Sequence, residues 1–207
     1  MTKIFAVSDI HGNYRALKKA LDNAGFDEND KSHLLVVLGD HFDRGEESLS
    51  VYEYLKELTD KNKAITLMGN HDLMLIDYLD GTVLDPFNYY QNGERETFAD
   101  FWHRTLPFES WCSIDKNIEQ PTNGDFARWL SVARKDINEE YPELLGWLKN
   151  QPYYLETKNY IFTHGAIDTK VEDWHKPHCY RYGYTDWDAL TWDDGSFFGR
   201  NITNTNK

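Results

Sequence analysis

The chain has 207 residues, which is enough for one well-cored domain and too few for two independent ones. Its 22 Lys and Arg stand against 35 Asp and Glu, a formal net charge of −13. An acidic surface repels nucleic acid and anionic membranes, so neither is an expected partner. The two cysteines form no Cys-x-x-Cys pair, the N-terminal apolar segment is too short for a signal peptide, and no run reaches membrane-spanning length, so a cytoplasmic location is expected.

Three strand–loop–helix units are predicted before residue 81. Apolar residues at helical spacing follow each of three apolar runs, which are Ile4–Val7, Leu34–Leu38 and Ala64–Met68. The helices are expected from Tyr14, over about 48–58 and over about 73–79. Alternating strands and helices are typical of an α/β fold, whose binding sites lie at the carboxyl ends of the strands.

Each predicted strand is followed by polar side chains of the kinds that bind metal ions. These residues are Asp9 with His11 after the first strand, Asp40 after the second and Asn70 after the third. Parallel strands end at one edge of a sheet, so the three motifs are expected to meet in space. His164 follows a predicted hairpin with strands at 153–156 and 159–162, and is expected to join them.

The pattern changes between about residues 81 and 151, where proline and glycine interrupt aromatic-rich segments. We expect mostly short helices there, as an insert within a single domain over residues 1–207. Its aromatic side chains are expected to form a small core rather than to stack on nucleic acid bases, although the insert could roof the site.

The carboxylate, imidazole and amide groups form a ligand set that favours Mn, Fe or Zn over Ca or Mg. Asp40 is suited to bridge two ions, because each of its carboxylate oxygens can bind a different one. Asn70 and His164 then supply a neutral oxygen and a ring nitrogen for the second ion. Two such ions can activate a shared water and orient its attack on phosphorus.

A leaving group at phosphorus also needs a proton. His71 is the best candidate for the acid if a carboxylate such as Asp43 bonds its other nitrogen. The planar fork of Arg44 matches two phosphate oxygens. His41 is expected to be a pocket-wall or solvent residue rather than a ligand, because Asp40 already fills the adjacent role.

Four motifs together resemble the successive blocks of the calcineurin-like metallophosphoesterases, and these motifs are Asp9-x-His11, Gly39-Asp40-His41-Phe42-Asp43-Arg44-Gly45, Gly69-Asn70-His71-Asp72 and Thr163-His164-Gly165. Arg44-Gly45 and Ser48-Leu49 are most similar to the phosphoprotein phosphatase branch. That branch includes small bacterial and phage members and the related symmetrical diadenosine tetraphosphate hydrolases.

The resemblance implies a four-layer α/β/β/α sandwich with a dinuclear metal centre. One ion would be bound by Asp9, His11 and Asp40, and the other by Asp40, Asn70 and His164. Arg44 and Asn70 would contact the substrate phosphate, and His71 paired with Asp43 would be the acid. A second phosphate-binding arginine is usual in the family, and the candidate here is Arg200.

The family pattern also has a later Gly-His block that completes the second metal site, and nothing after Trp192 supplies it. The chain therefore resembles a C-terminally truncated member, which leaves open whether its second sheet and second metal site are complete. The sequence does not predict the oligomeric state.

The first functional hypothesis is dinuclear-metal-dependent hydrolysis of phosphate monoesters by a protein serine/threonine phosphatase. Manganese is the expected metal, and the substrate would be a phosphorylated protein or a small phosphoester. The alternative in the same fold is a hydrolase of dinucleoside polyphosphates such as diadenosine tetraphosphate. An alternative of another class is a phosphatase-like binding protein with weak or no catalysis.

Overall fold

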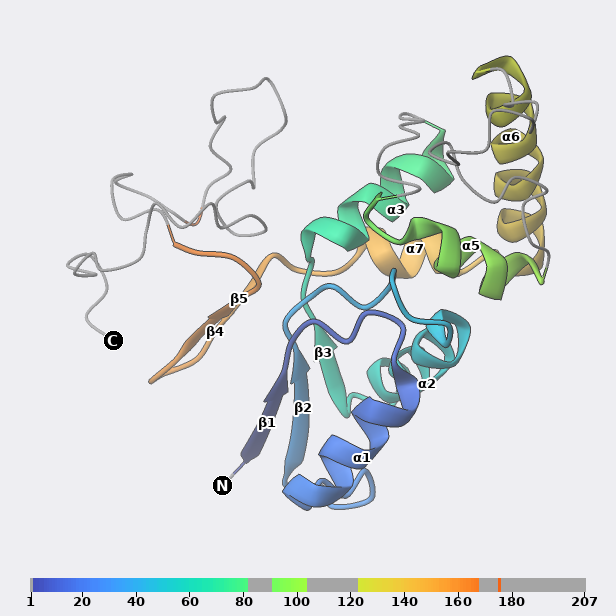
Figure 1. Cartoon of the computed structure of the whole chain (residues 1–207). Coiled ribbons are helices and arrows are strands. Elements are labelled where there is room, and N and C mark those ends of the chain that lie inside the picture. The colour runs from blue at the N-terminus through green and yellow to red at the C-terminus, as the bar shows by residue number, and fades with distance from the viewer. Residues whose placement is uncertain (1, 82–90, 104–122, 168–174, 176–207) are drawn as a thin grey trace.

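The computed structural model describes residues 2–81, 91–103, 123–167 and 175 (Figure 1). Within these residues the elements, in chain order, are β1 (Lys3–Val7), α1 (Tyr14–Ala24), β2 (His33–Val37), α2 (Ser48–Asp60), β3 (Ala64–Thr66), α3 (Asn70–Asp80), α5 (Glu94–Trp102), α6 (Asn123–Glu140), α7 (Leu144–Lys149), β4 (Tyr154–Glu156) and β5 (Ile161–Thr163).

The first three strands form a parallel sheet in the order β1-β2-β3. The central strand β2 is the most deeply buried, because Leu35, Val36 and Val37 have no exposed surface. Such a continuous apolar run is typical of a parallel strand that is covered on both faces. The alternation of strand and helix in the sequence is therefore confirmed as an α/β unit.

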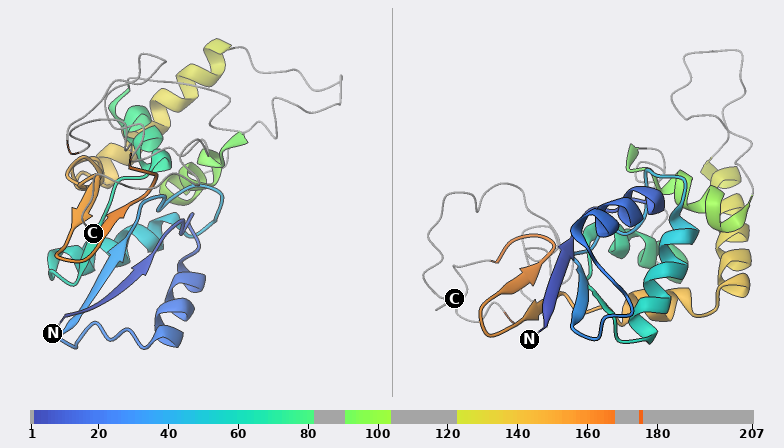
Figure 2. Two further views of the ribbon diagram at one scale, coloured as in Figure 1. Left: turned by 90° about the vertical axis from the view of Figure 1, so that its left-hand side faces the viewer. Right: turned by 90° about the horizontal axis from the view of Figure 1, so that it is seen from below.

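Helices α1 and α2 lie on one side of the parallel sheet, and the β4–β5 hairpin lies on the other (Figure 2). Leu17 and Leu21 of α1 and Leu55 and Leu58 of α2 are buried in one core cluster with residues of the sheet. Their spacing of three and four residues places each pair on a single helix face, as expected for an amphipathic helix against a sheet.

The hairpin is a second, two-stranded antiparallel sheet in which Tyr154 pairs with Thr163. Its position brings residue 164 to the carboxyl end of the parallel sheet. The parallel sheet together with this second sheet agrees with the predicted α/β metallophosphoesterase sandwich.

Helix α3 begins at Asn70, earlier than the sequence predicted. The Asp72 carboxylate accepts the backbone N–H of Gly69 at 2.9 Å, which caps the first turn and allows the helix to start there. The start of α3 is therefore set by a local side-chain bond.

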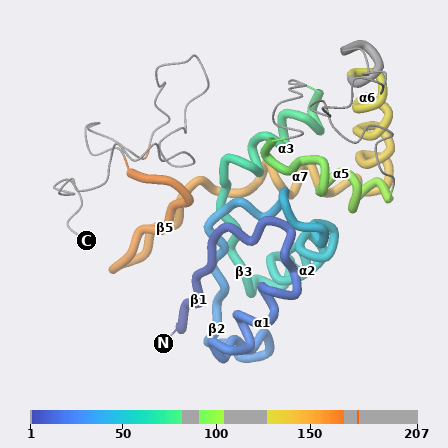
Figure 3. The backbone as a smooth tube through the Cα atoms, in the orientation of Figure 1, coloured from blue at the N-terminus to red at the C-terminus, as the bar shows by residue number. Residues whose placement is uncertain are grey.

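The segment predicted as a helical insert contains α5, α6 and α7 in its described part. A second core cluster joins these helices to α3, and includes Phe98, Phe101, Leu130 and Leu148. The tube view shows the chain leaving the sheet through α3 and returning along α7 to the hairpin (Figure 3). The organisation as one domain with an insert remains a prediction.

In the described part of the chain, no helix has the length and apolar character required to cross a membrane.

Candidate metal centre

The loops that follow β1 and β2 meet the start of α3 at the carboxyl end of the parallel sheet (Figure 1). Backbone bonds join the first two loops: the His11 N–H donates to the Asp40 carbonyl at 3.0 Å, and the Gly45 N–H donates to the His11 carbonyl at 3.0 Å. The Gly69 backbone is equally close, because a Cβ on it would lie 2.3 Å from the Asp40 nitrogen. The candidate residues are therefore held by backbone, not by flexible side chains.

Several candidate site residues have left-handed backbone conformations, which cost energy in residues other than glycine. Their φ angles are 55° at Asp9, 46° at His11, 54° at Asp40, 72° at Asp43 and 70° at Arg44. Strain of this kind persists only where surrounding bonds hold it, and it gathers at functional sites. These turns therefore mark the loops as a built site rather than as ordinary connections.

Asp40 lies between two groups of candidate ligands. Its Oδ2 is 3.6 Å from His11 Nε2, and its Oδ1 is 3.3 Å from His164 Nε2. Asp9 Oδ1 lies 3.9 Å from His11 Nε2, and Asn70 Oδ1 lies 3.0 Å from His164 Nε2. The two oxygens of one buried carboxylate thus face different groups, as a bridging ligand requires.

The hydrogen bonds of two histidines determine which ring nitrogen can bind a metal. His11 Nδ1 lies 2.8 Å from the Phe42 carbonyl and His164 Nδ1 lies 2.6 Å from the Leu38 carbonyl. A carbonyl only accepts, so each Nδ1 carries the proton, and in the neutral ring, which is the form that binds a metal, each Nε2 presents a lone pair. His164 Nε2 then faces the Asn70 oxygen, and two acceptors at 3.0 Å are complementary to a cation. The donor set therefore fits a divalent metal.

The ionised form of Asp40 is favoured in this arrangement. Burial alone would raise the pKa of Asp40, but the hydrogen bond and charge of His164 outweigh burial and hold that pKa below its usual value. Burial alone would lower the pKa of His164, but the Asp40 carboxylate outweighs it and raises that pKa. A carboxylate that stays ionised is the form that can ligate a metal.

His71 and Asp43 form a buried pair beside the ligands. His71 Nδ1 lies 2.7 Å from Asp43 Oδ2, and both side chains are almost fully enclosed. Burial raises the pKa of Asp43, against the opposing effect of its hydrogen bonds from His71 and Thr97. His71 Nε2 points the other way and lies 3.0 Å from an amino group of Arg44, whose second amino group lies 2.7 Å from His11 Nε2. Arg44 is exposed to solvent, so a phosphate can reach it.

Asp72 is a residue that the sequence motifs did not single out for a role. Its buried carboxylate accepts the backbone N–H groups of Asp40 at 2.9 Å, His41 at 3.1 Å and Gly69 at 2.9 Å. These bonds join the loop of the bridging aspartate to the start of α3. The only sequence signal was its place two residues after Asn70.

His41 differs from expectation in one respect. It belongs to neither ligand group in the described chain, as predicted, but it is fully buried and not exposed to solvent. Its ring packs edge-on against Trp147 at 5.7 Å between centroids, and its Nδ1 lies 2.8 Å from Asp72. The pattern of the loop could not show this, because Trp147 comes from a distant helix.

The predicted second phosphate-binding arginine, Arg200, lies outside the described residues.

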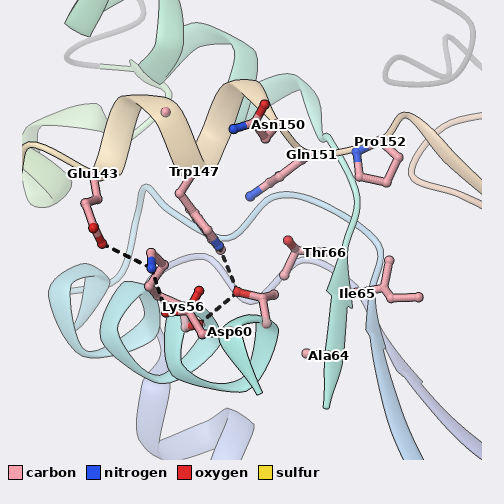
Figure 4. A pocket seen from close by; sticks show the side chains of 12 residues that line it. Lys56, Asp60, Ala64, Ile65, Thr66, Glu143, Trp147, Asn150, Gln151 and Pro152 are labelled. Atoms are coloured by element: carbon pink, nitrogen blue, oxygen red, sulfur yellow. Dashed lines mark hydrogen bonds and ion pairs between the residues drawn. The ribbon is translucent and has the colours of Figure 1, made fainter. Parts of the chain in front are cut away.

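A cavity of about 560 Å³ lies between α2, β3 and α7, away from the ligand groups (Figure 4). Lys56 bridges Asp60 and Glu143 at its rim, at 2.6 and 3.1 Å. Inside it the amide of Gln151 is buried and makes no hydrogen bond in the described chain. None of the candidate ligands lines this cavity, so it is not the site of the predicted chemistry.

A family model described as calcineurin-like phosphoesterase matches residues 2–198. The chain belongs to the calcineurin-like metallophosphoesterases. The family implies divalent metal ions. The described residues agree with this, because they include two groups whose candidate ligand atoms lie within 4.8 Å of one another: Asp9, Asp40 and His164, and His11, Asp40 and His71. Asp40 belongs to both groups, and Asp9 Oδ1 also lies 3.9 Å from His11 Nε2, so the division of the ligands between two ions remains a prediction.

This metallophosphoesterase is similar to proteins named symmetrical bis(5'-nucleosyl)-tetraphosphatase. The one from Aeromonas hydrophila is 43% identical over 138 residues, covering 67% of this chain and 40% of the relative. The one from Nitrosospira multiformis is 46% identical over 78 residues, covering 38% of this chain and 27% of the relative. The matches thus span less than half of these relatives.

A crystal structure described as that of a diadenosine tetraphosphatase resembles the metallophosphoesterase with a TM-score of 0.50 at 19% identity. The match covers 91% of this chain and 57% of that chain. At this identity the comparison supports the fold alone.

Proposed function

We propose that the chain is a metal-dependent phosphoric ester and anhydride hydrolase, and that its substrate is a dinucleoside tetraphosphate. The observation that carries the reaction class is the position of Asp40 between two groups of ligands, beside the buried His71–Asp43 pair. The relatives named as symmetrical tetraphosphatases carry the choice of substrate. They favour this alternative over the first hypothesis, which was a protein serine/threonine phosphatase. None of the described residues specifically supports a protein substrate.

The proposed ligands are Asp9, His11, Asp40, Asn70 and His164. Manganese is the first choice of metal, and iron or zinc also suit nitrogen and oxygen ligands. Bound divalent ions would supply Lewis acidity at the phosphate and activation of the attacking water.

The chain's own residues would then hold the substrate and supply a proton. Arg44 would bind two oxygens of the phosphate with its planar fork, because the residue is exposed and its guanidinium lies beside His11. His71 would donate a proton from Nε2 to the leaving oxygen, while Asp43 on Nδ1 stabilises the ring's orientation and charge. Symmetrical cleavage would release two nucleoside diphosphates.

The test is turnover of diadenosine tetraphosphate, a phosphopeptide and an aryl phosphate in added Mn, with Asp40→Asn as the inactive control. We expect the tetraphosphate to be cleaved with the highest kcat/KM and to yield ADP alone. A preference for the phosphopeptide would restore the protein phosphatase hypothesis. Equal activity of the wild type and Asp40→Asn would contradict the proposed site.

The alternative of another class is a binding protein without catalysis. Metal analysis of the purified chain separates it from the enzyme. Fewer than one bound ion per chain, together with no hydrolysis of any of the three substrates in Mn, Fe or Zn, would favour the binding protein.

A further inference from the structure

Helix α5 touches the loop that carries Asp43 and Arg44 through one of its faces. The contacts come from Gly93, Thr97 and Asp100, which are four and three residues apart and so lie on one side of the helix. The Gly93 carbonyl accepts the Arg44 N–H at 3.0 Å. The Asp100 carboxylate accepts the Leu49 N–H at 2.7 Å, at the start of α2.

Thr97 lies at the middle of this face and is fully buried. Its hydroxyl donates to Asp43 Oδ1 at 2.8 Å and accepts the Asp43 backbone N–H at 2.8 Å. A hydroxyl has one proton and two lone pairs, so the remaining contact, at 3.2 Å, is a bond that Ser48 donates. Every bonding position of this hydroxyl is therefore occupied, and its orientation is determined.

These bonds hold the strained part of the loop. Asp43 and Arg44 are consecutive residues in the left-handed region, and their N–H groups are the ones that donate to Thr97 and to the Gly93 carbonyl. Without acceptors at these two positions, two backbone donors would lose their partners, at a cost comparable to the strain itself. Helix α5 thus stabilises a conformation that the loop would not adopt alone.

The Asp43 side chain is held from both sides. One oxygen accepts from Thr97 and the other lies 2.7 Å from His71 Nδ1. Rotation of the carboxylate is blocked, so the direction of the bond to His71 depends on the Thr97 hydroxyl. His71 Nε2 in turn faces Arg44 and the ligand groups.

We propose that Thr97 is a positioning residue, which acts through Asp43 to orient His71 toward the leaving group. This role rests on the proposed hydrolase function and extends it to a helix outside the four sequence motifs. Thr97 itself does not touch the substrate. Its effect is expected in the proton-transfer step and not in metal binding.

The test compares Thr97→Val, which keeps the shape and removes the hydroxyl, with Thr97→Ser, which keeps the hydroxyl. We expect Thr97→Val to lower kcat about 10- to 100-fold, part of the full contribution of a general acid, while KM and bound metal change less than about 2-fold. Thr97→Ser should stay within about 3-fold of the wild type. A similar loss in both variants would overturn the proposal, because the hydroxyl would then not be the cause.

A second measurement separates positioning from loss of packing. Poor leaving groups need the acid most, so Thr97→Val should lose more activity on phenyl phosphate than on p-nitrophenyl phosphate. In a His71→Asn background the same change should cost less than about 2-fold, because the residue it acts through is absent. A full and additive loss in that background, equal for both leaving groups, would contradict the role.

A spectroscopic readout keeps the proposal testable even if the wild type hydrolyses no phosphoester. The Asp43-bonded imidazole proton of His71 should give a downfield proton NMR signal, assigned by its absence in His71→Asn. We expect the signal in Thr97→Ser and its loss or displacement in Thr97→Val. An unchanged signal in Thr97→Val would overturn the positioning role, whereas absence of all hydrolysis with this NMR pattern intact would overturn only the proposed function.

Discussion

At the scale of single residues, the site depends on where each hydrogen bond of a buried polar group ends. His11 and His164 donate Nδ1–H to backbone carbonyls, so in the neutral rings Nε2 is the nitrogen with the lone pair that can bind a metal. Asp72 uses its carboxylate on backbone N–H groups and belongs to neither ligand group of the described residues. Residues of one chemical type therefore have different roles because their partners differ.

Asp72→Asn is a prediction at this scale. The change keeps the shape but removes the charge and replaces one acceptor by a donor, which leaves backbone N–H groups of the loop unpaired. We expect a loss of about 2–4 kcal/mol in the free energy of unfolding. The metal affinity should also fall, because the Asp40 loop is no longer tied to α3. Denaturant unfolding and metal titration measure the two effects.

Asp80→Asn is the matched control in the same helix. Asp80 pairs with Lys149 on the surface at 2.7 Å, and such pairs contribute little. Stability and metal affinity in this variant should equal those of the wild type. If Asp72→Asn had the same stability and metal affinity as Asp80→Asn, the three backbone bonds to Asp72 would not be what holds the loop.

At the scale of elements, α5 packs against the loop after β2. Its first turn approaches that loop so closely that a side chain at Gly93 has no room. A Cβ there would lie 2.5 Å from the Arg44 nitrogen and 2.8 Å from the Arg44 Cα, and Gly93 has a φ of 85°. The helix and the loop therefore fit only with glycine at this position.

Gly93→Ala tests this fit. The backbone of Arg44 would have to move, so we expect kcat to fall at least about 10-fold and KM to rise, since a small displacement of a binding group costs much of its effect. Steady-state kinetics with an aryl phosphate measure both constants. Gly25→Ala is the control: Gly25 has a similar φ of 76°, but nothing lies within 4 Å of its Cβ position. It should lose stability by about 1 kcal/mol and keep its activity.

At the scale of the whole molecule, the formal net charge of −13 includes two aspartates of the candidate metal centre. Bound cations would relieve the repulsion between Asp9 and Asp40 and join the β5 end to the loops of the parallel sheet through His164. Metal binding should therefore stabilise the molecule as a whole.

Addition of Mn should raise the Tm, with a stabilisation of about 2.7 kcal/mol when the metal concentration is 100 times its Kd. A chelator should reverse the change. Asp40→Asn should abolish most of the shift, because Asp40 belongs to both ligand groups, whereas Asp80→Asn should keep it. Differential scanning fluorimetry measures these Tm shifts. Equal Mn-dependent shifts in the wild type and both variants would place the metal elsewhere.

Local patterns in the chain predict the strand–helix alternation, the four polar motifs and the chemical types of the candidate ligands. These follow from local patterns, because hydrophobic period and turn residues act over a few positions. The clustering of His11, Asp40 and Asn70 could be predicted since parallel strands end at one edge, whereas His164 follows the separate antiparallel hairpin.

Which atoms face one another depends instead on contacts between distant segments of the folded chain. The bond from His164 to Leu38 spans 126 positions and the bonds from Thr97 to Asp43 span 54, so no local pattern encodes them. The burial of His41 and the bonds from the Asp40 and His41 N–H groups to Asp72 depend in the same way on segments that meet only after folding. A buried polar group must find a partner wherever the fold provides one, and that choice belongs to the packed molecule.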